Sequence, residues 1–264
     1  MKDNEKEMSF LGHLEVLRWH LIRSVVSVLI FTTLSFYFKD IVFDRILLAP
    51  KSSEFITYRF FCYISDLFGF GDFLCFGDFE WTLNNFNMSG QFSAHIMISI
   101  FSGLILSFPY IFWELWRFVS PALKYKERAF SRGVVFFAST LFFLGVLFGY
   151  YIVSPLAINF LGSYQVSSEV ANQISLTSFI MTVATISFAN GIVFELPILV
   201  YFLTKAGLIT PEFMRKYRKH SMILILSLSA IITPPDVISQ ILLALPLLVL
   251  YELSINISSR ILRK

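Results

Sequence analysis

The chain has 264 residues, of which 56% are hydrophobic and 15% are charged, and its formal net charge is +3. An ordinary soluble domain has about 25% charged residues, and the apolar residues here come in long blocks that one aqueous core could not bury. Together with a mean hydropathy of +0.71, this composition excludes an ordinary soluble domain and predicts an all-α integral membrane protein.

Six apolar segments are candidates for transmembrane helices. They are roughly Leu21–Phe38, Phe92–Trp116, Val134–Tyr151, Leu176–Leu203, Ser221–Ile232 and Val237–Leu253. The last two are short: at about 1.5 Å per residue they reach about 18–26 Å, less than a hydrocarbon core of about 30 Å. We therefore expect a concave six-helix bundle in which either the bilayer thins beside helices 5 and 6 or longer helices cover them.

The Lys and Arg residues are distributed unevenly between the two sides of this map. Seventeen fall on the side that holds both termini, and four fall on the other, namely Lys39, Arg45, Lys51 and Arg59. Because basic residues favour the cytoplasmic side, both termini are expected to be cytoplasmic. The residues before the first span resemble neither a signal peptide nor a transit peptide, so the first helix is expected to remain as an anchor in a bacterial cytoplasmic (inner) membrane.

The domain organisation follows from this topology. We expect residues 1–264 to form a single six-span membrane domain, with an exported loop at about 39–91 and cytoplasmic loops at about 117–132 and 204–219. Cys62 and Cys75 both fall in the exported loop. They are either a disulfide, worth about 3 kcal/mol in the loop-entropy model, or two small half-buried hydrophobic residues, and the spacing alone does not decide between them.

Enzyme motifs are missing from the sequence. It has no HExxH, no GxSxG and no P-loop, and all four histidines lie near predicted membrane faces, where a buried Ser–His pair is hard to assemble. We therefore expect no enzyme activity, no catalytic residue, no metal and no cofactor.

Acidic residues in apolar surroundings are the remaining candidates for a site. Glu195 lies deepest, in GIVFELPILV, and Pro197 two residues later is expected to bend its helix. A carboxylate within a span normally faces a partner or a hydrated cavity, so Glu195 is either a functional acid or a structural one that joins two helices. Glu114 and Glu252 lie nearer the helix ends and are interpreted as interfacial acids close to basic loops.

Glycines in the third span give a further pattern. Gly145 and Gly149 form a GxxxG motif, which is typical of close helix packing.

Five motifs occur in order along the chain: HLEVLR (13–18), LLAP (47–50), FVSPALKYKER (118–128), FELP (194–197) and TPPDVISQ (233–240). Together they resemble the TatC family, the receptor subunit of the twin-arginine protein translocase. The resemblance runs from about Phe10 to Glu252 and includes the predicted span order and topology.

The resemblance implies a binding site for the two arginines of a folded cargo protein's signal peptide. It assigns this site to the N-terminal segment, with Glu15 and Arg18, and to the first cytoplasmic loop, with its glutamate at Glu127. Phe118, Pro121 and Leu123 belong to the same loop motif. Carboxylates suit this role because they accept forked hydrogen bonds from guanidinium groups, which lysine cannot reproduce.

Two residues depart from the family pattern at this site. Val16 stands where the family usually carries a second acid, and Glu114 stands where it tends to carry glutamine. Either Glu15 replaces the missing acid by a local shift, or Glu127 does most of the recognition.

The resemblance also implies partners within the membrane. It makes Glu195, with Gln240, a membrane-embedded polar site for TatA- and TatB-type single-span subunits, and it places Pro50 in the exported cap and Asp236 at the start of span 6, where it is well placed as a helix cap. The implied function is export of folded proteins driven by the proton-motive force, within a lipid-embedded complex that contains more than one copy of this chain and no nucleic acid. The alternative is a proton-coupled small-solute transporter that uses Glu195, although the sequence lacks the inverted repeat typical of that class.

Overall fold

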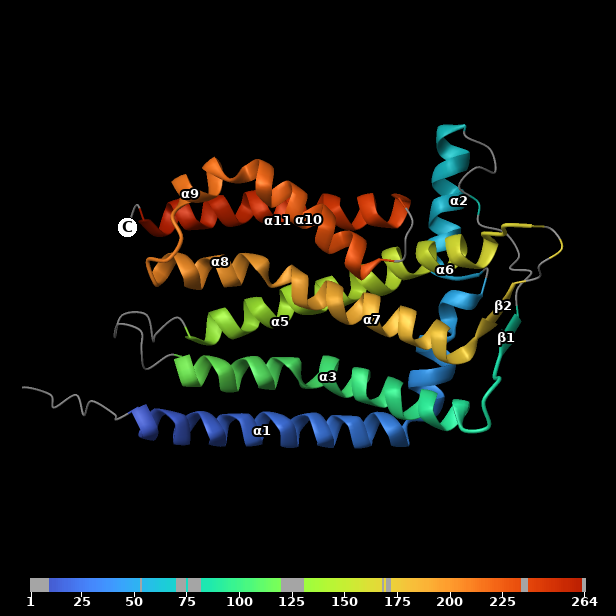
Figure 1. The fold of residues 1–264 in the computed structure, drawn as a ribbon, viewed down its shortest axis with the longest axis horizontal. Helices are drawn as coiled ribbons and strands as arrows, with labels where there is room; N and C mark the ends of the chain where they lie inside the picture. Colours follow the sequence, from blue (N-terminus) through green and yellow to red (C-terminus); the bar gives the residue numbers. More distant parts are fainter. Residues whose placement is uncertain are drawn as a thin grey trace, which may run out of the picture.

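The computed structural model describes residues 10–52, 54–69, 75, 82–119, 131–167, 169, 172–233 and 237–262. Most of these residues are helical, and the long helices lie side by side along one axis (Figure 1). The helices are α1 Phe10–Tyr37, α2 Ile56–Phe68, α3 Gly90–Val119, α5 Ser131–Phe148, α6 Ser154–Ser163, α7 Leu176–Phe194, α8 Leu196–Lys205, α9 Pro211–Lys216, α10 Arg218–Ile232 and α11 Val237–Leu262. Two π-helical segments, Asp40–Leu47 and Gly149–Val153, and a 3-10 turn, Ala49–Lys51, complete the helical part.

Within the described residues, five helical stretches are long and apolar enough to cross a membrane. They are Leu14–Tyr37, Gly90–Val119, Gly133–Ser163, Leu176–Lys205 and Ser239–Leu262. The predicted fifth span corresponds to α10, which has 15 residues and therefore reaches about 22 Å. It lies against α11 (Figure 1), as expected for a short helix covered by a longer one.

The expectation of a short sixth helix is wrong. α11 has 26 residues and ends at Leu262, not near Leu253. The apolar run does end near Leu253, but the serines that follow it are buried in the bundle. Ser254 and Ser258 are fully buried, and Ser258 Oγ accepts a hydrogen bond of 2.9 Å from Thr204 Oγ1 on α8. Small polar side chains that bond to neighbouring helices extend the packed face beyond the apolar run.

The described part of the chain is also not purely helical. The three-residue strands β1 (Thr82–Asn84) and β2 (Gln173–Ser175) form a parallel pair, in register from Thr82 opposite Gln173 to Asn84 opposite Ser175. β2 leads directly into α7 and β1 shortly precedes α3, and these two helices pack together. The segments that precede the two helices therefore run side by side in the same direction. The sequence has no alternation of apolar and polar residues there that would predict a strand.

Close packing between α5 and α7 confirms the interpretation of the GxxxG motif. A Cβ atom on Gly145 would lie 2.6 Å from the Asn190 carbonyl oxygen, and one on Gly149 would lie 2.9 Å from the Ser187 Cα. Only glycine allows the two backbones to approach this closely. One turn before Gly145, Phe142 stacks on Phe108 of α3 with ring centroids 3.6 Å apart, so α5 joins α7 to α3.

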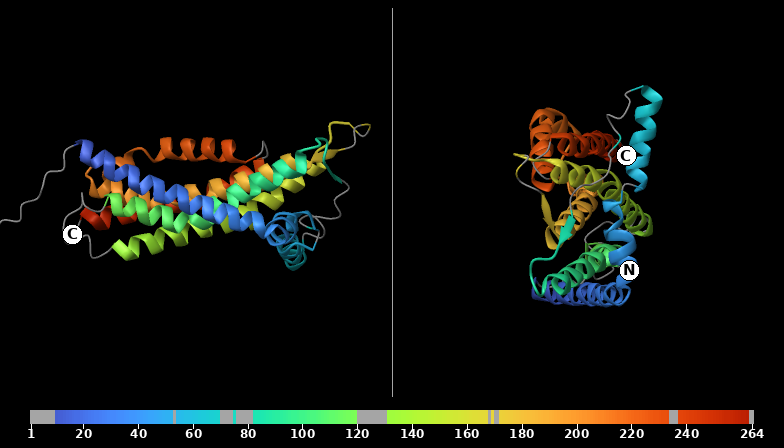
Figure 2. Two further views of the ribbon diagram at one scale, coloured as in Figure 1. Left: turned by 90° about the horizontal axis from the view of Figure 1, so that it is seen from below. Right: turned by 90° about the vertical axis from the view of Figure 1, so that its right-hand side faces the viewer.

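A cap, which we define as Asp40–Phe68, covers one end of the bundle. Helix α2 stands across the bundle axis at the end where α6 and the strands also lie (Figures 1 and 2). Cys62 of α2 forms a disulfide with Cys75, with the two Cα atoms 4.3 Å apart, so of the two alternatives the structure has the disulfide. The start of α1 and the end of α11 both lie at the opposite end of the bundle, on different edges (Figure 1).

Candidate functional site

α1 lies at the outer edge of the bundle and packs along α3, as the end-on view in Figure 2 shows. The two helices approach closely because Gly103 of α3 faces the Thr32 backbone: an added Cβ would lie 2.7 Å from the Thr32 nitrogen. The contact continues to the bundle end where α1 begins and α3 ends. Polar side chains from both helices meet there.

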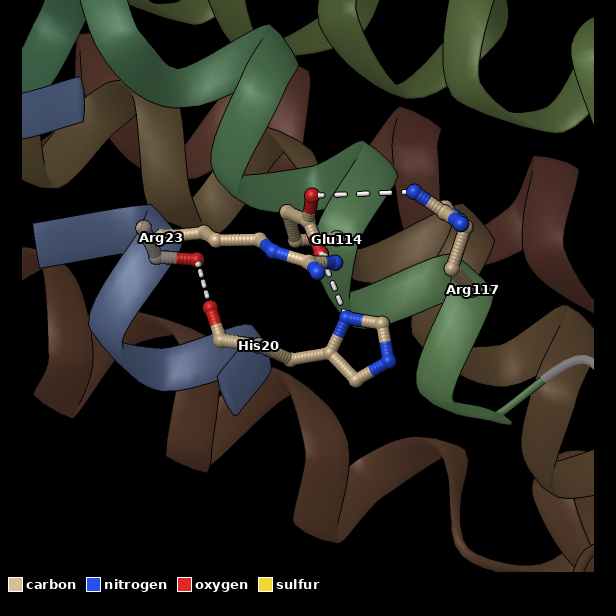
Figure 3. Close-up of polar contacts among 5 residues, drawn as sticks. His20, Arg23, Glu114 and Arg117 are labelled. Atoms are coloured by element: carbon tan, nitrogen blue, oxygen red, sulfur yellow. Dashed lines mark hydrogen bonds and ion pairs between the residues drawn. The ribbon is translucent and has the colours of Figure 1, made fainter. Parts of the chain in front are cut away.

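Four of these side chains form what we call the charge cluster: His20, Arg23, Glu114 and Arg117 (Figure 3). The Glu114 carboxylate is 1% exposed and lies at the centre. His20 Nδ1 donates a hydrogen bond to Glu114 Oε2. The Nη1 atoms of Arg23 and Arg117 each lie 3.9 Å from a carboxylate oxygen, and these two arginine side chains are about half exposed.

Glu114 lies close to basic residues near the end of its helix, as predicted, but it is buried between two helices, which was not predicted. Its charge is buried between α1 and α3 and balanced by cations of the same protein, as a buried carboxylate requires. The sequence shows only two pairs at helical spacing, His20 with Arg23 and Glu114 with Arg117. That these pairs face each other depends on helix packing across 94 positions of the chain, and no local pattern gives it.

The residues expected to bind a signal peptide divide between the described and the undescribed parts. Phe118, in the last turn of α3, contacts His20 edge-on with ring centroids 6.1 Å apart. Glu15 and Arg18 are exposed on the first turns of α1. Glu127, Pro121 and Leu123 lie outside the described residues. The structure thus brings the predicted N-terminal element and the start of the predicted loop element to one place.

The second predicted site centres on Glu195, where the helix is interrupted. α7 ends at Phe194 and α8 begins at Leu196 with Pro197 in its first turn. Pro197 has no backbone N–H to donate, and the Ile198 and Leu199 amides instead bond the Glu195 carbonyl at 3.0 Å. The predicted bend at Pro197 is confirmed, and α7 and α8 differ in direction in Figure 1.

The Glu195 side chain lines a cavity of about 280 Å³ between α3 and α8, which we call the Glu195 cavity. Both carboxylate oxygens are buried and have no hydrogen-bond partner among the described residues, although the Phe142 backbone lies close by. The Trp116 side chain lines the same cavity, and its Nε1 donor is likewise buried without a partner. The remaining lining is apolar: Phe112, Leu115, Val119, Ile198, Leu199 and Phe202. The cavity wall is therefore apolar, and the unpaired Glu195 oxygens and Trp116 donor lie buried behind it.

The last turns of α3 connect the two sites. Glu114 and Trp116 are two residues apart, so at about 100° per residue they project from nearly opposite faces of the helix. Glu114 faces α1, and Trp116 faces the Glu195 cavity.

The other predicted residues lie elsewhere. Gln240, on α11, donates from Nε2 to the Leu226 carbonyl oxygen at 3.1 Å and so joins α11 to α10; it does not line the Glu195 cavity. Pro50 is buried in the cap, and its carbonyl oxygen accepts a hydrogen bond from Tyr58. Asp236 lies outside the described residues. No cluster of three or more His, Cys, Asp or Glu residues that could hold a metal ion occurs among the residues described.

These features define a class: a helical membrane protein whose polar side chains are held between helices and around an apolar cavity. A family model described as "Sec-independent protein translocase protein (TatC)" matches residues 12–246. The chain belongs to the TatC family.

Individual relatives agree over nearly the whole chain. A Sec-independent protein translocase protein TatC of Blattabacterium sp. subsp. Periplaneta americana is 41% identical over 266 residues, which cover 100% of both chains. Two crystal structures described as the twin-arginine translocase receptor TatC are 35% and 36% identical. Their TM-scores are 0.71 and 0.72, and the matches cover 94% and 93% of this chain and 98% and 99% of the solved ones. These matches favour the translocase interpretation over a solute transporter.

Proposed function

We propose that this protein is the receptor subunit of a twin-arginine translocase, which binds the Arg-Arg signal peptides of folded proteins and assembles single-span TatA- and TatB-type partners around itself. The observation that carries this proposal is the junction of α1 and α3. There, the helix that bears Glu15 and the helix that leads toward Glu127 are joined through His20, Glu114 and Phe118. Two acids contributed from these two chain segments suit two neighbouring guanidinium groups.

The charge cluster limits which acids are available to bind the arginines of a signal peptide. Glu114 is buried and already surrounded by His20, Arg23 and Arg117, so it is poorly suited to accept a guanidinium group from a guest. Glu15 is exposed. We therefore assign the recognition to Glu127 and Glu15, with Glu114 as the residue that positions the two helices.

The proposed topology has six spans in a single concave membrane domain, with both termini in the cytoplasm of a bacterial cell and the cap on the exported side. Two observations support it. The start of α1 and the end of α11 lie at one end of the bundle (Figure 1), as an even number of spans requires, and the basic residues of the sequence gather on that side. In this topology α10 is the short fifth span.

The Glu195 cavity is the proposed contact for a partner within the membrane. Behind its wall, the Glu195 oxygens lack a donor and the Trp116 Nε1–H lacks an acceptor among the described residues. A carboxamide or hydroxyl side chain in a single-span partner supplies both, and pairing buried polar groups is far better than leaving them unpaired in lipid. TatA- and TatB-type subunits are the partners that family membership suggests, with transport driven by the proton-motive force.

Site-specific photocrosslinking from position 126, beside Glu127, to an Arg-Arg signal peptide tests the receptor function, with a Lys-Lys peptide as the control. We expect crosslinks to the Arg-Arg peptide that disappear with the Lys-Lys peptide, since lysine cannot form the forked contact. Equal crosslinking to both peptides, or none in protein shown to be folded, would contradict the assignment of the site to Glu127.

A further inference from the structure

A groove runs along the outside of the α1–α3 junction, beside the charge cluster. Its volume is about 420 Å³, and its lining includes Trp19, Ile22, Arg23, Val26 and Ile30 of α1 and Tyr110 of α3. Trp19, Val26 and Ile30 are 56%, 47% and 54% exposed. Exposed apolar side chains on a membrane-spanning helix face lipid, so this groove opens to the bilayer.

The length of the groove matches one leaflet of a membrane. Its α1 residues recur every three or four positions and form one stripe of the helix. From Trp19 to Ile30 this stripe extends about 17 Å, and half of a hydrocarbon core is about 15 Å. An acyl chain lying along α1 would therefore fit from the interface to the middle of the bilayer.

A cation, Arg23, lies in this stripe one turn after Trp19. Arg23 is the last charged residue of α1 before the uncharged run from Ser24 to Phe38. Its guanidinium is 49% exposed and 3.9 Å from Glu114 Oε2, the oxygen that already accepts from His20. That distance exceeds the 2.7–2.9 Å typical of a charge-assisted hydrogen bond, so Glu114 does not satisfy the donors of Arg23.

The surroundings of Arg23 also favour an anion. Trp19, which also lines the groove, is of the residue type enriched at membrane interfaces. Guanidinium groups bind phosphate through paired N–H donors. A protein helix in this groove would need an acid inside its own span to meet Arg23, which is costly, whereas an anionic lipid carries its phosphate at this depth in any case.

We propose that this groove binds one anionic phospholipid, with its phosphate on Arg23 and one acyl chain along Ile22, Val26 and Ile30. The site is distinct from the signal-peptide site and from the Glu195 cavity. The assignment of this site to the cytoplasmic leaflet rests on the proposed topology, and the rest of the proposal does not.

Arg23 and Arg117 form a matched pair for the test. Both lie 3.9 Å from Glu114 and are equally exposed, at 49% and 48%, but only Arg23 lines the groove. Full-length protein in detergent is titrated with phosphatidylglycerol and with phosphatidylcholine of the same acyl chains, and bound lipid is counted by native mass spectrometry. We expect one phosphatidylglycerol to bind about tenfold or more tightly than phosphatidylcholine, because both carry the phosphate but the choline cation of the second is repelled by the arginine. Arg23→Gln should remove this preference, and Arg117→Gln should keep it.

A second variant tests the acyl chain. Val26→Trp fills the groove from an exposed position and leaves Arg23 intact, so it should weaken phosphatidylglycerol binding. If Arg23→Gln fails to fold, this variant still tests whether the lipid occupies the groove. Glycerol phosphate at the same concentration should not compete.

Four results would overturn the proposal. The first is equal affinity for the two lipids, and the second is equal loss of binding in Arg23→Gln and Arg117→Gln. The third is displacement of the lipid by glycerol phosphate. The fourth is photocrosslinks from position 26 to protein instead of lipid in native membranes.

Discussion

The phenol of Tyr58 donates a hydrogen bond to the Pro50 carbonyl oxygen at 3.0 Å and lies 3.2 Å from that of Pro155. One side chain of α2 thereby joins the turn that precedes it to the start of α6. Tyr58 is 2% exposed, and burial raises the pKa of its phenol well above the usual value. The group therefore remains a protonated donor at neutral pH.

Replacing Tyr58 by phenylalanine should loosen the cap. The change leaves buried carbonyl oxygens without their donor, which should lower the free energy of unfolding by about 1–3 kcal/mol. Thermal unfolding in detergent measures this, with Tyr63→Phe as the control because Tyr63 is 66% exposed on the same helix. Equal unfolding midpoints for the two variants would show that the Tyr58 hydroxyl does not hold the cap.

Gly145→Ala should destabilise the α5–α7 contact. The new Cβ would meet the Asn190 carbonyl oxygen at 2.6 Å and the Phe194 Cβ at 2.8 Å, so the helices must separate at a cost of about 1–3 kcal/mol. Gly133→Ala, in the same helix, is the matched control because nothing lies within 4 Å of its added Cβ. It should be neutral or slightly stabilising, since alanine favours helix. An unfolding midpoint unchanged in both variants would count against the close approach.

Glu114 and Glu252 allow the stability cost of losing a buried acid to be compared with that of losing an exposed one. Glu114→Ala removes the carboxylate shared by His20 and two arginines and should cost about 3–5 kcal/mol. Glu252 pairs with Arg218 at 2.7 Å, but both side chains are 46% exposed, so Glu252→Ala should cost at most about 1 kcal/mol. The comparison is made by thermal unfolding of the two variants side by side. A larger loss in Glu252→Ala would contradict the burial of Glu114.

Glu195→Ala tests whether the acid is functional or structural. Because neither carboxylate oxygen is paired within the described chain, its removal should leave the unfolding midpoint unchanged or raise it. Crosslinking of an Arg-Arg signal peptide from position 126, beside Glu127, should persist, and transport of an Arg-Arg precursor should fall. A lowered midpoint would favour the structural role, in which the acid joins two helices.

The Cys62–Cys75 disulfide can be tested together with the topology. A maleimide that does not cross membranes should label neither cysteine in intact cells until a reductant is added. Labelling without reductant would contradict the disulfide, and failure to label in its presence would place the cap on the wrong side of the membrane. A Cys62→Ser, Cys75→Ser variant controls for labelling of other proteins.

Local chemistry explains which features the sequence could predict. Pro197 acts on its own helical turn, and Gly145 and Gly149 recur at the spacing of one helix face. The break at Glu195 and close packing at the two glycines were therefore accessible from the sequence, whereas the partner helix α7 was not. The burial of Glu114 could not be predicted from the sequence, because its partner His20 lies on another helix. The length of α11 was underestimated because apolarity ends before helicity does, and buried serines continue the packed face. The strands β1 and β2 are defined only by each other.

The parallel pairing of β1 with β2 has a consequence for biosynthesis. Thr82 and its partner Gln173 are separated by about 90 positions in the sequence. Tyr58 and its partner Pro155 are separated by a similar number of positions. A chain that emerges from the ribosome N-terminus first can join Cys62 to Cys75 early, but it cannot complete this end of the molecule until the residues just before α7 have been translated. A nascent chain arrested before Pro155 would therefore leave Tyr58 of the cap without this partner, and protease sensitivity of residues 54–69 would report how far translation has advanced.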